Sequence, residues 1–192
     1  MPKPQAQPNT YAFIDSQNLN LGTQRTGWKM DWRRFRQFLH DKYGVTQAYM
    51  FIGYMSENET LYEYMHELGF LVVLKPTLDV TATKEAEPTG DAATNKPKSK
   101  DEDKVPVKGN VDAELVLYTM KELPNYDQAI IVSGDGDFFS LAEYLEEQGK
   151  LAYIMTPNWQ YSSLLKVFEP KIIRLDQLSR QLAYHDRKKK KP

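Results

Sequence analysis

The sequence predicts an α/β fold built on a mainly parallel central sheet, on the strength of two patterns. Six short runs are continuously apolar rather than alternating, as strands covered on both faces are. Stretches with apolar residues at helical spacing lie between those runs. Strands that alternate with helices pair in parallel through right-handed crossover connections. In such a sheet, ligands bind beyond the carboxyl ends of the strands.

The expected strands share this apolar character and cover residues 11–14, 48–52, 71–74, 129–132, 151–155 and 172–173. The first expected helix, 31–43, has an apolar face made of Trp32, Phe35, Phe38 and Leu39. The second has a face made of Leu61, Met65 and Leu68. The third has a broader apolar surface made of Leu115, Leu117, Tyr118 and Met120. Three further helices are expected at 138–148, 162–167 and 176–184.

Three stretches of the 192 residues are too poor in apolar side chains to offset the entropy of ordering them. They are a disordered N-terminal segment at 1–10, a flexible internal loop at 81–104 and a basic C-terminal tail at 185–192. The remainder has the size of one compact domain. We therefore predict a single domain over 11–184 that contains the loop.

The composition excludes several classes of function. The 25 Lys and Arg balance 26 Asp and Glu, so binding to nucleic acid through the overall field of the protein is excluded and local patches must supply it. The absence of cysteine excludes disulfides, thiolate metal sites and cysteine nucleophiles. No apolar run is long enough to cross a membrane and no signal peptide begins the chain. We expect a soluble, cytoplasmic protein without a membrane partner.

Acidic residues follow two of the expected strands. Asp15 comes directly after the first strand, with Ser16 and Asn18 close behind, and the fourth strand runs into Ser133, Gly134, Asp135, Gly136 and Asp137. Each aspartate alone has a structural explanation: Asp137 as the N-cap of a helix beginning at Phe138, and Asp15 and Asp135 in turns. Together, converging carboxylates raise one another's pKa unless a cation neutralises them. Mg²⁺ or Mn²⁺ is the simplest such partner.

A third polar element opens the helix after the long loop. It reads Lys108-Gly109-Asn110-Val111-Asp112-Ala113-Glu114. Asp112 and Glu114 can simply favour the positive end of a helix dipole. Alternatively, Asp112 is another metal carboxylate and Lys108 contacts a phosphate.

Three segments resemble, in order, the signatures of the NYN domain family. They are Phe13-Ile14-Asp15-Ser16-Gln17-Asn18, Lys108-Gly109-Asn110-Val111-Asp112 and Ile131-Val132-Ser133-Gly134-Asp135-Gly136-Asp137-Phe138. The family belongs to the PIN-like nuclease fold and includes the LabA-like bacterial proteins. The resemblance covers about 11–175. It implies a three-layer α/β/α PIN-like domain with a metal-dependent, ribonuclease-like site.

The family's acidic positions correspond to Asp15, Asp112, Asp135 and Asp137, which the resemblance makes metal ligands and, with Asn18, catalytic residues. We expect substrate contacts from Ser16, Lys108, Ser133 and Gly134. Many relatives carry a further acid on the helix after the second signature, where this chain reads Leu117-Tyr118-Thr119-Met120. Glu114 lies about 200° round that helix from Asp112 and is no obvious replacement.

The function expected from this resemblance is hydrolysis of RNA phosphodiester bonds with Mg²⁺ or Mn²⁺. The partner is single-stranded or structured RNA, with DNA as an alternative substrate, and a homodimer is also considered. One competing interpretation is a catalytically weak RNA-binding or regulatory NYN module acting through a protein partner. Another is a Toprim-like phosphate-handling domain, although such sites place a glutamate where this chain has Asp15. Trp159 and Tyr161 either stack an unpaired base or pack in the core.

Overall fold

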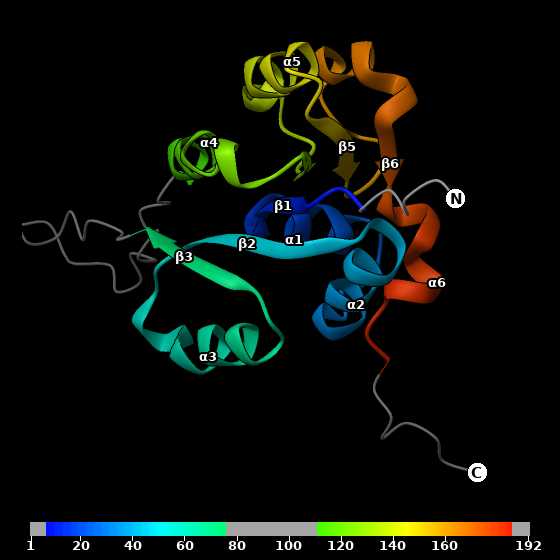
Figure 1. Cartoon of the computed structure of the whole chain (residues 1–192). Helices are drawn as coiled ribbons and strands as arrows, with labels where there is room; N and C mark the ends of the chain where they lie inside the picture. The colour runs from blue at the N-terminus through cyan, green and yellow to red at the C-terminus, as the bar shows by residue number, and fades with distance from the viewer. Residues whose placement is uncertain (1–6, 76–110, 186–192) are drawn as a thin grey trace, which may run out of the picture.

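The computed structural model describes residues 7–75 and 111–185, whose strands all belong to one six-stranded sheet (Figure 1). The strands are β1 (Thr10–Asp15), β2 (Val45–Gly53), β3 (Leu71–Lys75), β4 (Gln128–Val132), β5 (Leu151–Thr156) and β6 (Ile172–Arg174). Their order is β3-β2-β1-β4-β5-β6 and every neighbouring pair is parallel. All six expected strands and the α/β class are confirmed.

The α-helices are α1 (Ser16–Arg25), α2 (Trp32–Tyr43), α3 (Glu59–Glu67), α4 (Asp112–Lys121), α5 (Phe139–Glu147) and α6 (Ser179–Leu182). Short 3-10 segments connect them at Ser56–Asn58, Leu123–Asn125, Gly136–Phe138, Ser163–Lys171 and Leu175–Leu178. The expected helix at 162–167 therefore falls in the 3-10 segment Ser163–Lys171 rather than in an α-helix, and Pro170 lies in that segment. Parts of the chain expected to be disordered lie outside the described residues. These are the whole loop 81–104, residues 186–192 of the tail 185–192 and residues 1–6 of the segment 1–10.

Two apolar cores lie on opposite faces of the sheet and make the fold three-layered. On one face, Phe13 and Phe51 pack with Leu115 of α4 and Leu145 of α5. On the other, residues of the alternate strand positions pack against α1, α2, α3 and α6, through Leu19, Phe35, Met65 and Leu182. Figure 1 shows α4 and α5 on one side of the strands and α2, α3 and α6 on the other. Both faces of the sheet are buried, which explains the continuously apolar strand sequences.

The apolar faces expected for two helices are only partly confirmed. In α3 the buried residues are Tyr62 and Met65, whereas Leu61 is exposed. In α4 they are Leu115 and Thr119, whereas Leu117 is 61% exposed. Helix α1 is an addition, because no helix was expected between the first strand and residue 31.

The sheet order places the ends of β1 and β4 side by side. From β1 the chain builds outward through β2 to β3, and then returns to place β4 on the other flank of β1. Ile14 pairs with Val132, so Asp15 and Ser133 are the next residues on adjacent strands. Such a reversal of strand order opens a crevice at the carboxyl ends, where α/β sheets bind ligands.

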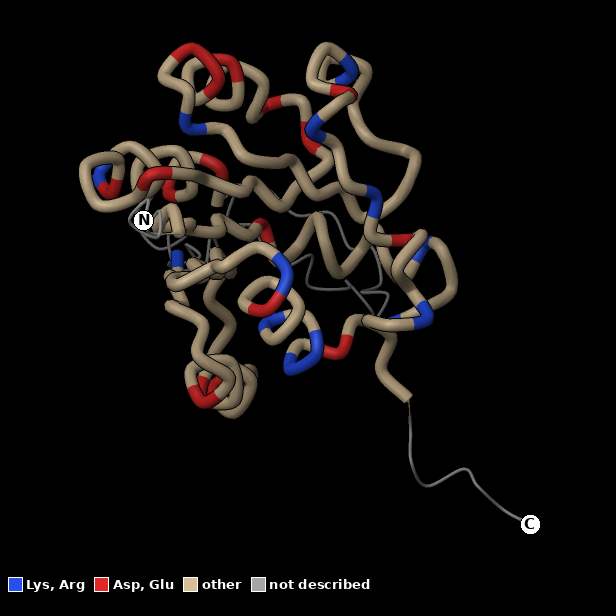
Figure 2. Tube along the Cα trace, turned by 45° about the vertical axis from the view of Figure 1, so that its right-hand side comes forward, with Lys and Arg blue, Asp and Glu red and all other residues tan. Residues whose placement is uncertain are grey.

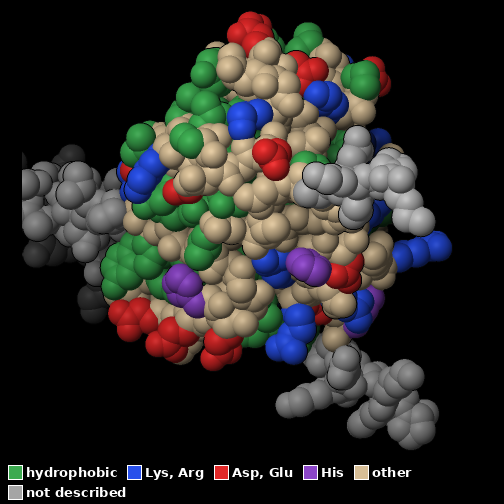
Figure 3. Space-filling model, in the orientation of Figure 1, with side chains coloured by type: hydrophobic (Ala, Val, Ile, Leu, Met, Phe, Trp, Pro, Cys, Tyr) green, Lys and Arg blue, Asp and Glu red, His purple; other side chains and the backbone are tan. Residues whose placement is uncertain are grey.

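The surface carries mixed charge. Figure 2 shows Lys and Arg interspersed with Asp and Glu along the trace. Figure 3 shows hydrophobic side chains on the side of the molecule where α4 and β3 lie, and the exposed apolar residues of these two elements are Leu71, Leu74, Leu117 and Met120. Across residues 7–75 and 111–185, we find no helix with the length and apolar character needed to cross a membrane.

Candidate metal centre

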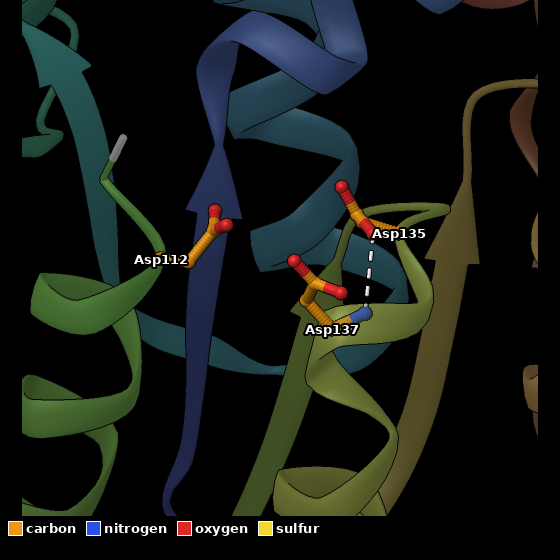
Figure 4. Close-up of side chains that lie close together, drawn as sticks. All are labelled: Asp112, Asp135 and Asp137. Atoms are coloured by element: carbon orange, nitrogen blue, oxygen red, sulfur yellow. Dashed lines mark hydrogen bonds between the residues drawn. The ribbon is translucent and has the colours of Figure 1, made fainter. Parts of the chain in front are cut away.

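Three aspartates from two segments converge at the carboxyl ends of β1 and β4. Asp112 is the first residue of α4, and Asp135 and Asp137 lie in the turn after β4. One carboxylate oxygen from each lies within 4.8 Å of the other two. Figure 4 shows all three carboxylates on the side where β1 and β4 end. The structure thus brings together three of the four aspartates that the resemblance makes metal ligands.

The donor set and its spacing fit a hard divalent cation. Two oxygens bound to one Mg²⁺ at about 2.1 Å lie at most about 4.2 Å apart. The observed 4.8 Å limit is only slightly larger, so small side-chain rotations would bring all three oxygens within range. Carboxylate oxygens are the ligands that Mg²⁺ and Mn²⁺ prefer. Asp112, Asp135 and Asp137 could thus hold such an ion.

Local hydrogen bonds fix the turn that carries two of these residues. Asp135 is the N-cap of the 3-10 segment Gly136–Phe138, and its Oδ1 accepts a hydrogen bond from the backbone N–H of Asp137 at 3.1 Å. The expected N-cap role of Asp137 is wrong, because Asp135 caps the segment and α5 begins at Phe139. A side chain at position 136 would also meet Ser162, whose Cβ would lie 3.0 Å from the new Cβ.

Asp15 is buried beside this cluster but is not one of the three. Only 5% of its surface is exposed, and its carboxylate accepts hydrogen bonds from the Asn18 backbone N–H at 3.0 Å and the Ser133 hydroxyl at 3.2 Å. Burial raises the pKa of Asp15, and the charges of Asp112 and Asp135 raise it further, while the two hydrogen bonds act in the opposite direction. A cation bound in the cluster would offset this cost of ionising Asp15.

The polar residues around Asp15 join β1 to the loop after β4. The side-chain oxygen of Asn18 accepts a hydrogen bond from the Gly134 N–H at 2.9 Å, and Ser133 Oγ accepts one from the Asp135 N–H at 3.2 Å. Ser16 donates its hydroxyl to the carbonyl oxygen of Phe51 at 2.7 Å.

These bonds change the roles expected for three residues. Ser16, Ser133 and the Gly134 N–H were expected to contact substrate, but their donors are engaged within the protein. Their contacts fit positioning of the aspartates. Lys108, the fourth expected substrate contact, lies outside the described residues. Glu114 pairs with Lys75 at 3.0 Å and is not part of the cluster.

A cavity of about 400 Å³ lies over the aspartates. Its walls come from the start of α4, the turn after β4, helix α1 and the loop after β5, and its lining residues are Asp15, Gln17, Asn18, Leu21, Gly22, Arg25, Val111, Asp112, Gly134, Asp135, Asp137, Pro157, Asn158 and Gln160. From this loop after β5, the sequence suggested only Trp159 and Tyr161 as base-stacking residues, and Pro157, Asn158 and Gln160 were not expected in the site. The rule that ligands bind beyond the carboxyl ends of parallel strands could have identified them, because β5 also ends at this edge of the sheet.

A second hollow, of about 510 Å³, lies between α2 and α3, away from the aspartates. Arg36 lines it, and its guanidinium donates to the carbonyl oxygens of Gly69, Val45 and Thr46. This arginine therefore joins α2 to the start of β2 and to the turn after α3. The acidic cavity remains the candidate site.

Comparisons with known proteins agree with this geometry. The family model described as NYN domain matches residues 9–176. Among solved structures, the crystal structure of a protein of unknown function from Vibrio parahaemolyticus is similar, with a TM-score of 0.66 and 19% sequence identity, over 94% of this chain and 98% of that chain. Similarity at this identity concerns the fold alone. The search of curated proteins finds no match.

Proposed function

Because this chain belongs to the NYN domain family, we propose that it is a metal-dependent ribonuclease that hydrolyses phosphodiester bonds at the aspartate cluster. The NYN domain has a PIN-like nuclease fold, and the chain has a cluster of three aspartates at the ligand-binding edge of its sheet. The observation that carries the proposal is the convergence of the Asp112, Asp135 and Asp137 oxygens within 4.8 Å.

The residues of the chain divide into ligands and positioning groups. Asp112, Asp135 and Asp137 would hold Mg²⁺ or Mn²⁺, and the buried Asp15 beside them would add negative charge. When bound, the ion lowers the pKa of a water molecule and neutralises charge on the phosphate. Asn18 and Ser133 hold the loop after β4 against β1, which keeps the carboxylates in place.

We propose RNA as the substrate, and the experiment tests DNA in parallel reactions. Labelled single-stranded RNA of mixed sequence is incubated with wild type and Asp135→Asn, each with Mg²⁺, Mn²⁺ or EDTA. The asparagine retains an acceptor for the Asp137 N–H, so the turn should survive the change. Glu143→Gln, which changes an exposed carboxyl on α5, is the matched control.

We expect wild-type cleavage that requires the metal and falls by about 100-fold or more in Asp135→Asn, because loss of groups that only orient ligands already costs about 10- to 100-fold. The control should cleave like wild type. Equal cleavage by wild type and Asp135→Asn would show that cleavage does not depend on the aspartate cluster and would refute the proposal. Labelled single-stranded DNA in parallel reactions tests the alternative substrate.

A second candidate function has one specific observation in its favour. The stretch Leu117–Met120 of α4 adds no acid to the cluster, and Thr119 is buried with its hydroxyl donated to Leu115. A site with fewer acids is typical of weak catalysis. The candidate is an RNA-binding or regulatory module acting through a protein partner, and RNA binding without cleavage in the same experiment would favour it.

A further inference from the structure

Trp159 is an exposed aromatic side chain in the loop that forms one wall of the acidic cavity. It follows β5 and lies between Asn158 and Gln160, both of which line the cavity. Asn158 and Pro157 are buried, yet Trp159 is 55% exposed. Tyr161, the other aromatic residue of this loop, packs instead against the core. The loop therefore buries its polar asparagine and exposes its largest apolar ring, the reverse of the usual arrangement.

Hydrogen bonds hold the loop that carries Trp159. Asn158 donates its side-chain N–H to the Gly22 carbonyl at 2.8 Å and accepts from the Gln160 N–H at 2.7 Å. Thr156 donates its hydroxyl to the Asn158 carbonyl at 3.2 Å. The bond to Gly22 attaches the loop to α1, whose first residues lie beside the aspartates, and the other two bonds fix the loop internally. The loop is thus ordered before any ligand binds, which lowers the entropic cost of binding.

Close packing against α1 adds to this order. A Cβ at position 22 would lie 2.7 Å from Pro157 Cγ, closer than side-chain carbons approach. Glycine at this position therefore allows the loop to lie directly on the helix. The backbone on both sides of Trp159 is fixed by these contacts.

The ring of Trp159 is itself supported from one side. The guanidinium of Arg174, in β6, lies 5.8 Å from the ring centroid. Asp176 holds that guanidinium through two hydrogen bonds, of 3.2 and 2.6 Å. Because its charge is paired, Arg174 acts mainly as a support for the ring. The remaining surface of the indole is open for another flat group.

Charge favours a nucleobase as that group. The cavity is lined by four aspartates, and Arg25 is the one Lys or Arg among its described lining residues. A phosphate chain is repelled by such a surface until a cation binds. Stacking of a base on an aromatic ring does not need phosphate charge, and every base has a face that can stack.

We propose that Trp159 stacks an unpaired base of the substrate next to the phosphate held at the aspartates, so that the site selects single-stranded nucleic acid. The proposal rests on the proposed nuclease function and names the form of its substrate. A base inside a duplex is stacked on both faces and cannot lie on the indole.

Binding is tested with a fluorescein-labelled single-stranded RNA of about 12 nucleotides and Mg²⁺, on proteins that carry Asp135→Asn to prevent cleavage. Adding Trp159→Ala should lower affinity about 5- to 150-fold. Trp159→Phe should restore most of the loss, because it keeps a stacking face. Tyr184→Ala is the matched control and should bind normally, because it removes a ring that is 59% exposed and has no sequence neighbour in the cavity wall.

A single abasic residue, moved along the RNA, separates stacking from a structural role of the tryptophan. With Trp159 present, affinity should fall at one position of the abasic residue. With Trp159→Ala, the scan should be flat at that position. Single-stranded DNA should give the same pattern, and a duplex of the same sequence should bind in a way that does not depend on Trp159.

Three results would overturn the proposal: unchanged RNA affinity in Trp159→Ala, a flat abasic scan with Trp159 present, or no single-strand binding at all. Cleavage assays on wild type and on the Trp159→Ala single variant distinguish failure of the stacking proposal from failure of the proposed nuclease function. Strand binding that depends on Trp159 without any cleavage would refute the nuclease and support the stacking site. Metal-dependent cleavage with a KM that Trp159→Ala does not change would support the nuclease and refute the stacking site.

Discussion

The side-chain oxygen of Asn18 accepts a hydrogen bond from the backbone N–H of Gly134, and this 2.9 Å contact joins the first turn of α1 to the loop after β4. The two residues are far apart in sequence but lie beyond neighbouring strands. The backbone N–H of Asn18 in turn donates to Asp15. One residue therefore contacts both the buried aspartate and the loop that carries Asp135 and Asp137.

Asn18→Ala should leave the Gly134 N–H without its acceptor. We expect the free energy of unfolding to fall by about 1–2 kcal/mol, the cost of a part-buried unpaired donor. The cleavage rate should fall by a larger factor than the loss of folded protein explains, because the Asp135 carboxylate loses its fixed position. Asn18→Asp is the matched variant, since it keeps the acceptor and should preserve more stability. Urea unfolding and cleavage kinetics test both, and full stability of Asn18→Ala would show that the contact is unimportant.

Asp15 should make the metal-free protein less stable as pH rises. Its pKa is raised above the ordinary 3.8 by burial, so the folded protein holds this proton more tightly than the unfolded chain. Its contribution to the free energy of unfolding therefore falls from about pH 4 up to the raised folded pKa. Asp15→Asn should remove this dependence and be at least as stable as wild type at pH 7 in EDTA.

Thermal unfolding between pH 4 and pH 7 in EDTA measures the difference between wild type and Asp15→Asn, with Glu143→Gln as the control. Mg²⁺ or Mn²⁺ should stabilise wild type more than the variant at pH 7, because the ion offsets the charge of Asp15. A variant that is less stable than wild type at pH 7 in EDTA would contradict this account.

Gly22→Ala should separate α1 from the loop after β5. The added methyl group overlaps Pro157, and overpacking of this kind costs about 1–3 kcal/mol. Binding of single-stranded RNA should weaken as well, because the loop carries Trp159. Combining Gly22→Ala with Pro157→Gly removes the overlapping ring, so the double variant should be more stable than the sum of the two changes predicts. Strict additivity would indicate that the overlap is relieved elsewhere.

Arg25→Ala should weaken substrate binding with little change in kcat. Arg25 is exposed at the end of α1 and lines the cavity, where it can contact a phosphate that is not being cleaved. The slope of log affinity against log salt concentration should decrease by about 0.7 for one lost phosphate contact on a single strand. Arg25→Lys should keep that slope, and Arg33→Ala on α2 is the control. An unchanged slope in Arg25→Ala would remove Arg25 from the substrate path.

The strands and the aspartates were accessible from sequence for physical reasons. Buried parallel strands are apolar on both faces, so each strand appeared as an uninterrupted run. Polar residues directly after β1 and β4 then had to lie at one edge, which brought Asp15 and Asp135 together. The family resemblance supplied Asp112, whose placement depends on a connection that no local pattern describes.

Other features depended on tertiary contacts. Helix α1 was missed because Ser16–Arg25 contains Ser, Asn, Thr and Gly, which favour other structures, and only Leu19 anchors it in the apolar core. The face of α4 was misjudged because Leu115, Leu117 and Thr119 allow more than one apolar stripe. The identity of the cap, Asp135 rather than Asp137, depended on where the 3-10 turn begins.

The order β3-β2-β1-β4-β5-β6 divides the sheet into two consecutive parts of the chain. The first part contributes Asp15 and Asn18, and the second contributes Asp112, Asp135 and Asp137. Cutting the chain within 76–110 would yield two fragments whose strands meet where β1 pairs with β4, with α6 of one packed on α2 of the other. Neither fragment holds the complete site, so the protein is suited to fragment complementation, with the proposed metal-dependent cleavage as the signal that the halves have joined.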